Sequence, residues 1–248
     1  LFPYYTDDKI TESYENTGPK TIIRVQKDQR IYLWEPFSCR YLGMYHTKRS
    51  IAKSIVGNKL LFIEQNIDLG LTFSYQWAPA DKLGWVRTAT ISNDGNQDIT
   101  IELLDGLQNV MPAGVERITQ NTFSTLVDGY KKTEQVPQTS MVLFRMEAIL
   151  VDRAEPSECL KCNTIYTLGL PQATYLTSSS QLDNFRLGKT IYEENASKGV
   201  RGAIFAHTTF TLLPNQQLQW MFVCDVMQDA VSVRRTLAFA QREDAIQQ

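Results

Sequence analysis

Hydrophobic and polar residues alternate along most of this chain with a period of two, which is the pattern of a strand with one buried face. The clearest stretch is residues 85–106, WVRTATISNDGNQDITIELLDG. Its first arm, residues 86–91, and its second arm, residues 99–103, both alternate in this way. This stretch therefore predicts two neighbouring strands, and we expect the rest of the chain to be organised around them.

The segment between these arms is rich in Asn, Asp and Gly, which tolerate the positive φ of tight turns. We therefore interpret residues 85–106 as a β-hairpin in an antiparallel sheet. Its Ile101 and Leu103 are expected in the core, and Asp94 and Gly95 at an exposed turn.

Further short strands are predicted on both sides of this hairpin. They cover residues 21–25, 30–34, 59–66, 69–77, 141–151 and 163–168. The segment 141–151 is apolar at successive positions, so it is expected to be buried on both faces. Residues 202–213 and 217–226 predict a second hairpin, because Pro214 and Asn215 lie between them.

Other segments lack the alternation. Residues 1–20 are predicted as an extended arm, residues 41–55 as a solvated connection with a local cluster of cations, and residues 170–187 as a long loop. Residues 116–132 have mixed periodicity and are interpreted as short helical or irregular structure.

The period changes to that of a helix in residues 229–247, where Val233, Leu237 and Ala240 share one face and Phe239 lies nearly opposite. No glycine caps the predicted end of this helix, which suggests that more chain follows. We therefore expect a β domain over residues 1–228, and over residues 229–248 the start of a linker.

About a dozen strands against one or two helices, without β-α-β alternation or a fixed repeat, predict an all-β fold. The expected architecture is a large antiparallel β-sandwich, larger than the roughly 100 residues of an immunoglobulin-type domain. With 43% hydrophobic residues in 248, the chain can bury a substantial core.

Charge and hydropathy exclude two classes of partner. Lys and Arg number 25 and Asp and Glu 27, so the chain lacks the cation excess of a nucleic-acid-binding surface. No apolar run approaches the roughly 20 residues that span a bilayer. Nucleic acid and membrane are therefore not expected partners.

Four cysteines are present, and two of them, Cys159 and Cys162, have CxxC spacing. A zinc site needs two further ligands, which only the other cysteines, His46 and His207 could supply, without a recognisable spacing. We expect ordinary free thiols, no metal and no cofactor.

Residues 57–134 resemble the N-terminal domain of the cellobiose-phosphorylase-like glycoside phosphorylases. The matching segments are residues 69–73 (LGLTF), 86–93 (VRTATISN), 101–106 (IELLDG) and 123–126 (FSTL), together with the strand pair around Leu213 and Pro214. The resemblance implies a β-supersandwich of the galactose-mutarotase-like type. In that family the domain precedes a linker helix and an (α/α)₆ barrel that carries the catalytic acid.

The function implied by this resemblance is that of a non-catalytic N-terminal domain of a carbohydrate-active enzyme, of the glycoside phosphorylase or hydrolase type. The expected partners are carbohydrate, the protein's own C-terminal catalytic domain, against which this domain would pack to shape the sugar cleft, and a second copy in a homodimer. The catalytic residues would lie in the barrel, so none is assigned in this chain.

Sugar rings stack on exposed aromatic side chains, and the candidates for such a site are Trp77, Trp85 and Tyr130. Trp77 is favoured because residues 78–81 are interpreted as a loop at which it would be exposed. The alternative for each is packing in the core, which is the commoner place for a strand tryptophan.

Cleavage of a glycosidic bond needs two facing carboxylates, and no spacing of the acidic residues singles out a pair. An aldose mutarotase needs a histidine and a carboxylate, for which His207 and Glu116 are the alternative acid and base. A stand-alone mutarotase or epimerase, and a carbohydrate-binding or structural β module, therefore remain as alternatives.

Overall fold

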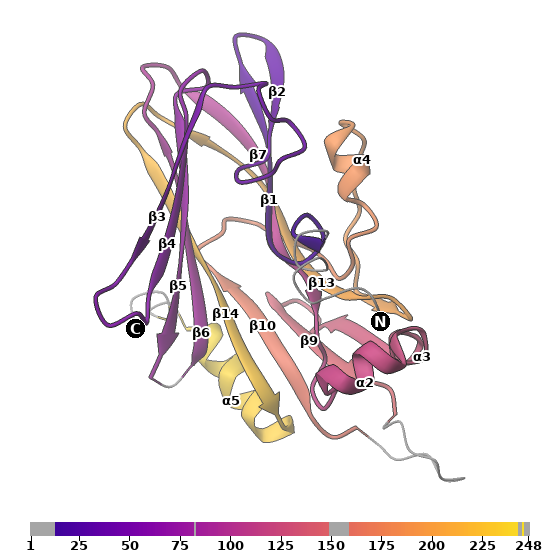
Figure 1. Cartoon of the computed structure of the whole chain (residues 1–248). Coiled ribbons are helices and arrows are strands. Elements are labelled where there is room, and N and C mark those ends of the chain that lie inside the picture. The colour runs from indigo at the N-terminus through magenta and orange to yellow at the C-terminus, as the bar shows by residue number, and fades with distance from the viewer. Residues whose placement is uncertain (1–12, 82, 149–158, 243–244, 246–248) are drawn as a thin grey trace.

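The computed structural model describes residues 13–81, 83–148, 159–242 and 245. Two antiparallel sheets pack face to face, and short helices lie along their edges and outer faces (Figure 1). This confirms the predicted all-β sandwich with a helix near its C-terminal end. None of the helices in this described part is long and apolar enough to cross a membrane.

Strands make up most of the regular elements, and the helices between them are few. The strands are β1 (Gly18–Lys27), β2 (Arg30–Trp34), β3 (Thr47–Lys53), β4 (Leu60–Asn66), β5 (Leu71–Ala80), β6 (Gly84–Asn93), β7 (Ile99–Val110), β8 (Lys131–Gln135), β9 (Met141–Met146), β10 (Cys162–Leu168), β11 (Thr174–Leu176), β12 (Ala196–Lys198), β13 (Gly202–Leu212) and β14 (Gln217–Gln228). The helices are α2 (Arg117–Thr122), α3 (Ser124–Gly129), α4 (Leu182–Arg186) and α5 (Ala230–Ala240).

The two sheets differ in size. The smaller has five strands in the order β11-β13-β7-β1-β2, and the larger has nine in the order β12-β8-β9-β10-β14-β6-β5-β4-β3. The last two strands of the chain take inner positions: β13 lies between β11 and β7, and β14 lies between β10 and β6. The core lies between the sheets, where the alternating apolar residues of both inner faces meet, among them Ile101 and Leu103 at 0% exposure.

Residues 85–106 do not form a hairpin, contrary to the sequence prediction. Strand β6 pairs with β5 and β14 in the larger sheet, whereas β7 pairs with β1 and β13 in the smaller one. The segment 94–98 therefore carries the chain from one sheet to the other, and the two strands form an arch. Alternation and turn residues are the same for a hairpin and an arch, so the sequence pattern does not distinguish them.

The second predicted hairpin is also an arch, because β13 belongs to the smaller sheet and β14 to the larger. Asn93, which is fully buried, joins the two arches. Its backbone N–H donates to Gln216 O at 2.9 Å, its carbonyl accepts from Asn215 N at 2.9 Å, and its side chain donates to Leu212 O at 3.1 Å. In the first arch the turn does expose Asp94, and Gly95 needs no positive φ there.

Three segments hold more regular structure than the sequence predicts. The segment 41–55 contains the edge strand β3, whose residues are all exposed and so show no apolar alternation. The segment 170–187 contains β11 and α4, which are too short for a periodic pattern. Strand β1 begins at Gly18, inside the predicted arm. Of the predicted strand 141–151, β9 is confirmed, but its expected burial on both faces is not: Val142, Phe144 and Met146 are buried, whereas Leu143 and Arg145 on the other face are only partly buried. Residues 149–151 lie outside the described part.

Helices cover the outer faces of both sheets. On the smaller sheet, Leu182 and Phe185 of α4 pack in a cluster with buried residues of β1, β7 and β13. On the larger sheet, α5 packs against the outer face of β10 and β14, and Asp229 caps it by accepting from Ser232 N at 2.8 Å. Phe239 joins the same cluster as Val233 and Leu237.

Replacement of Ile101 by alanine should lower the free energy of unfolding by about 2–5 kcal/mol, because it opens a cavity between the sheets. Ile118→Ala is the matched control, since Ile118 is 72% exposed on α2 and its truncation should cost under about 0.5 kcal/mol. Urea denaturation of both variants measures the difference. Equal losses would show that Ile101 is not in a packed core.

Candidate functional site

The candidate site lies on the inner face of the larger sheet, near the turn that joins β5 to β6. Trp77 lies opposite Arg87 in the register of these strands, and Pro79 lies opposite Trp85. Alternate residues of a strand share a face, so both tryptophans project from the same side of the sheet. They are diagonal neighbours, at a separation of about 7–8 Å between Cα atoms.

Exposure identifies Trp85 as the accessible member of the pair. Its side chain is 54% exposed, whereas Trp77 is half-buried and packs against the inter-sheet core. Leu60 lies opposite Trp77 on β4 and is 39% exposed, and Pro79 is exposed as well. We call these four residues the tryptophan face. An exposed apolar surface of this kind is typical of a ligand or partner site.

A buried ion pair lies beside the tryptophan face, on the same side of the larger sheet. Arg87 Nη1 lies 2.8 Å from Asp105 Oδ2, and its Nη2 lies 3.0 Å from Asp105 Oδ1, with both side chains at 0% exposure. Asp105 also accepts from Thr21 Oγ1 at 2.6 Å and from Trp220 Nε1 at 2.6 Å. The pair joins β6 of the larger sheet to β7 of the smaller one.

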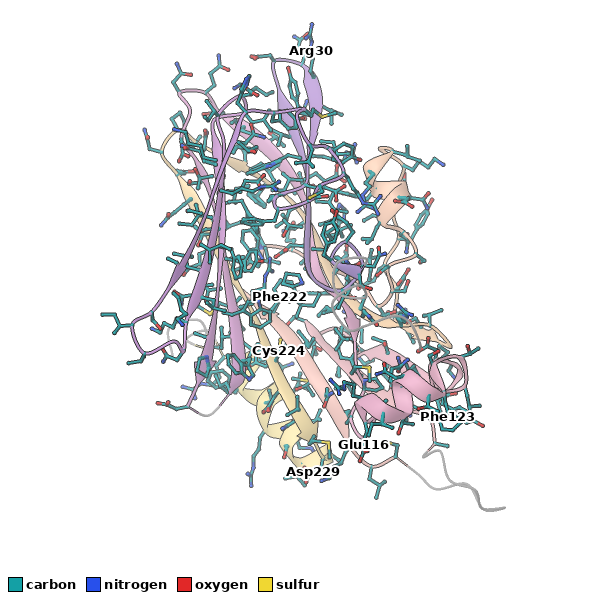
Figure 2. The ribbon with its side chains drawn as sticks, in the orientation of Figure 1. Arg30, Glu116, Phe123, Phe222, Cys224 and Asp229 are labelled. Atoms are coloured by element: carbon teal, nitrogen blue, oxygen red, sulfur yellow. The ribbon has the colours of Figure 1, made fainter. Side chains whose placement is uncertain are left out.

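Aromatic rings enclose the guanidinium of this pair. Arg87 lies 4.7 Å from the ring centroid of Tyr75 and 5.6 Å from that of Phe222. Figure 2 shows Phe222 and Cys224 in the middle of the larger sheet, on β14. Stacking on two rings and two hydrogen bonds to Asp105 hold Arg87 in one position. Trp77, which lies opposite Arg87, therefore has a rigidly held side chain as its neighbour on β6.

Burial keeps two weak acids of this region, the Cys224 thiol and the Tyr75 phenol, protonated. It raises the pKa of the Cys224 thiol, which lies opposite Trp85, to about 12. It also raises the pKa of the Tyr75 phenol, a shift that the Arg87 charge opposes. Neither group therefore supplies an anionic nucleophile near neutral pH, and the tryptophan face has the chemistry of a binding surface.

Tyr130, the third sugar-binding candidate, lies elsewhere. It follows α3 at the start of β8 and is 38% exposed, and its carbonyl accepts from Glu147 N at 2.9 Å. The structure thus brings together Trp77 and Trp85 but not Tyr130.

Glu116, a candidate acid or base, lies just before α2 and is exposed (Figure 2). It lines a cavity of about 700 Å³ whose walls are mainly apolar, including Met146 and Met227. Glu116 is the sole carboxylate among the described residues that line it. The pair of carboxylates that glycosidic cleavage needs is therefore not assembled by these residues.

His207, the other candidate, lies on the outer face of the smaller sheet. Its Nε2 is 3.0 Å from Glu102 Oε1, and Arg24 Nη1 is 2.8 Å from Glu102 Oε2. The hydrogen bond from His207 lowers the pKa of Glu102, and the charge of Arg24 acts in the same direction. The structure thus pairs His207 with Glu102, and among the described residues no hydrogen bond or ion pair joins it to Glu116.

Sequence reasoning missed the Arg87–Asp105 pair. The spacing of the acidic residues singles out no pair, yet Asp105 is fully buried. A signal was present, because Arg87 alternates in phase with Ala89 and Ile91, which form the buried face of β6. An arginine in that phase needs a buried anion.

Comparison with known proteins assigns no family. No family model matches the chain, and no curated protein matches its sequence. Similar solved structures include a polysaccharide lyase (12% identity, TM-score 0.48, 94% of this chain and 29% of the lyase covered). Another is a candidate kojibiose phosphorylase from the human microbiome (9% identity, TM-score 0.48, 90% of this chain and 25% of the phosphorylase covered). A third is the GH36 α-galactosidase AgaA from Geobacillus stearothermophilus (8% identity, TM-score 0.38, 90% of this chain and 31% of the galactosidase covered). The chain spans between 25% and 31% of the length of these proteins.

Asp105→Ala should lower the free energy of unfolding by about 3–5 kcal/mol, because Arg87 would remain buried without its counter-charge. The double variant Arg87→Met/Asp105→Leu should lose less free energy of unfolding than Asp105→Ala, because it removes both charges. Asp183→Ala is the control, because Asp183 pairs with Arg186 but is 78% exposed. This substitution should lower the free energy of unfolding by less than about 1 kcal/mol. Guanidinium denaturation measures all three, and an Asp105→Ala loss as small as the control would contradict the buried pair.

Proposed function

We propose that this chain is a non-catalytic β-sandwich domain of a carbohydrate-active enzyme, and that it binds sugar on the tryptophan face. The observation that carries the proposal is the placement of Trp77 and Trp85 on one side of adjacent strands, with Trp85 54% exposed. An aromatic ring packs its face against the apolar C–H side of a pyranose and leaves the sugar hydroxyls in water.

The rigidity beside this face supports the proposal. A platform whose rings are already fixed loses little conformational entropy when a ligand binds. The Arg87–Asp105 pair and the rings of Tyr75 and Phe222 provide that rigidity at the position next to Trp77. The resemblance of residues 57–134 to glycoside phosphorylases supports the choice of sugar as the ligand.

The proposed enzyme is of the glycoside phosphorylase or hydrolase type, with a galactose-mutarotase-like supersandwich and a catalytic barrel in a further domain. In it, this domain packs against the barrel and shapes the sugar cleft. The surface that suits such packing is on α2 and α3, where Ile118, Phe123 and Leu126 are 72%, 55% and 53% exposed. Three large apolar side chains on one short helical segment favour burial against a partner domain.

Trp85→Ala should weaken binding of cello- or chito-oligosaccharides by about fivefold or more, because a stacking contact of ~1 kcal/mol is lost. Phe123→Ala is the matched control, because Phe123 has nearly the same exposure but lies on α3's border, away from β5 and β6. Isothermal titration calorimetry gives the affinities, and tryptophan fluorescence reports contact, since Trp34 and Trp220 are buried. Equal affinities of the wild type and Trp85→Ala would remove the tryptophan face as the site.

The chain by itself should neither hydrolyse nor phosphorolyse oligosaccharides, because its candidate acids do not form a facing pair. Assays with cello- and chito-oligosaccharides, each with and without phosphate, test this expectation. Turnover that disappears in Glu116→Gln would contradict it and place an active site in the cavity beside α2. Turnover that disappears in His207→Ala would instead favour a mutarotase-like site on the smaller sheet.

A further inference from the structure

A pocket separate from the tryptophan face lies where β7 ends and β12 leads into β13. It encloses about 630 Å³, a size typical of small-molecule sites. Its described lining is polar apart from Val200, and it includes three consecutive serines, residues 178–180. It shares no residue with the tryptophan face.

Glu194 holds the serine loop in place without lining the pocket. Its Oε2 accepts from Thr177 N at 3.0 Å and from Ser178 N at 2.9 Å. Its Oε1 accepts from Ser180 Oγ at 3.2 Å and from Gln181 Nε2 at 2.7 Å. A carboxylate with this many donors is satisfied by the loop itself, so the shape of the loop is set before any ligand arrives.

The wall next to the serines comes from the end of β7. Gln108 is 4% exposed and is anchored by a hydrogen bond from its Nε2 to Glu15 O at 2.6 Å. Asn109 has a positive φ of 55° and donates from Nδ2 to Thr17 Oγ1 at 3.0 Å. Ser179 Oγ meets Gln108 Oε1 only at 3.5 Å, so this hydroxyl has capacity for a stronger bond.

The pocket is lined by two cations and, among its described residues, by no carboxylate. Arg201 has a side chain 59% exposed, and its Nε lies 3.8 Å from Asp128 Oδ2. Lys198 is 61% exposed and pairs with Glu147 at 2.6 Å. The guanidinium of Arg201 therefore keeps most of its donors for a ligand, and a planar anion can accept two of them at once.

We propose that this pocket binds one acidic sugar unit. Its ring hydroxyls meet the serines and the amides of Gln108 and Asn109, and its anionic group meets Arg201, with Lys198 beside it. The sugar part of this ligand rests on the proposed function, whereas the anionic part rests on the charges of the pocket alone. The anion is a carboxylate in a uronic acid or a sulfate in a sulfated sugar.

Calorimetric titration of the whole chain with a hexuronate trisaccharide, a sulfated trisaccharide and neutral cellotriose tests the proposal. At least one acidic trisaccharide should bind, and Arg201→Gln should weaken it by about tenfold while leaving cellotriose unchanged. Lys189→Gln is the control, because Lys189 is an exposed cation outside the pocket, and it should change no affinity more than about twofold. Which acidic sugar binds identifies the anion.

Two results overturn the acidic-sugar site: no binding of either acidic trisaccharide at millimolar concentration, or binding that Arg201→Gln leaves unchanged. The proposed function fails separately. If Trp85→Ala leaves cellotriose affinity intact while Arg201→Gln abolishes acidic binding, the tryptophan face is excluded and the acidic pocket stands. If Trp85→Ala weakens every sugar and Arg201→Gln weakens none, the tryptophan face stands and the acidic pocket is excluded.

Discussion

The ion pair between Arg87 and Asp105 is the constraint on which the arrangement of the two sheets depends. Transfer of two charges from water to the interior costs several kcal/mol for each, and the loss is offset only when geometry and further hydrogen bonds are good. Here one charge belongs to each sheet, and Thr21 and Trp220 satisfy the rest of the carboxylate. A shift of one sheet along the other would separate the charges while both stayed buried. We infer that the pair selects one alignment of the sandwich where apolar packing alone would tolerate several.

The same pair links the core to the proposed binding surface. Arg87, Trp77 and Leu60 lie opposite one another on three successive strands of the larger sheet, so the buried ion pair lies next to the aromatic surface. The rings of Tyr75 and Phe222 close over the guanidinium and shield it from water. The packing that shields this buried charge thus also stiffens the surface on which we propose that a ligand stacks. The same side chains contribute to stability and to the proposed binding.

The sequence predicted where the strands lie more accurately than it predicted which strands pair with each other. Alternation located most strands, because burial of one face is a local property of each segment. It could not show that β6 and β7 belong to different sheets, since the partner of a strand lies far away in the chain. Trp77 and Trp85 were both chosen for their ring chemistry, but only the register of β5 and β6 places them together. Strand pairing also separates His207 from Glu116. Because β13 lies beside β7, His207 contacts Glu102 instead.

The late position of β14 in the chain has a consequence for synthesis on the ribosome. Strands β3 to β6 and strands β8 to β10 are complete early, but they are separate pieces until β14 enters between β6 and β10. Each piece meanwhile presents an unpaired strand edge and an uncovered apolar face, the two features that invite association between nascent chains. Completion of the larger sheet therefore waits for β14, which ends at Gln228, to leave the exit tunnel and pair with both pieces. A chaperone that shields the facing edges of β6 and β10 would cover both edges until β14 pairs with them.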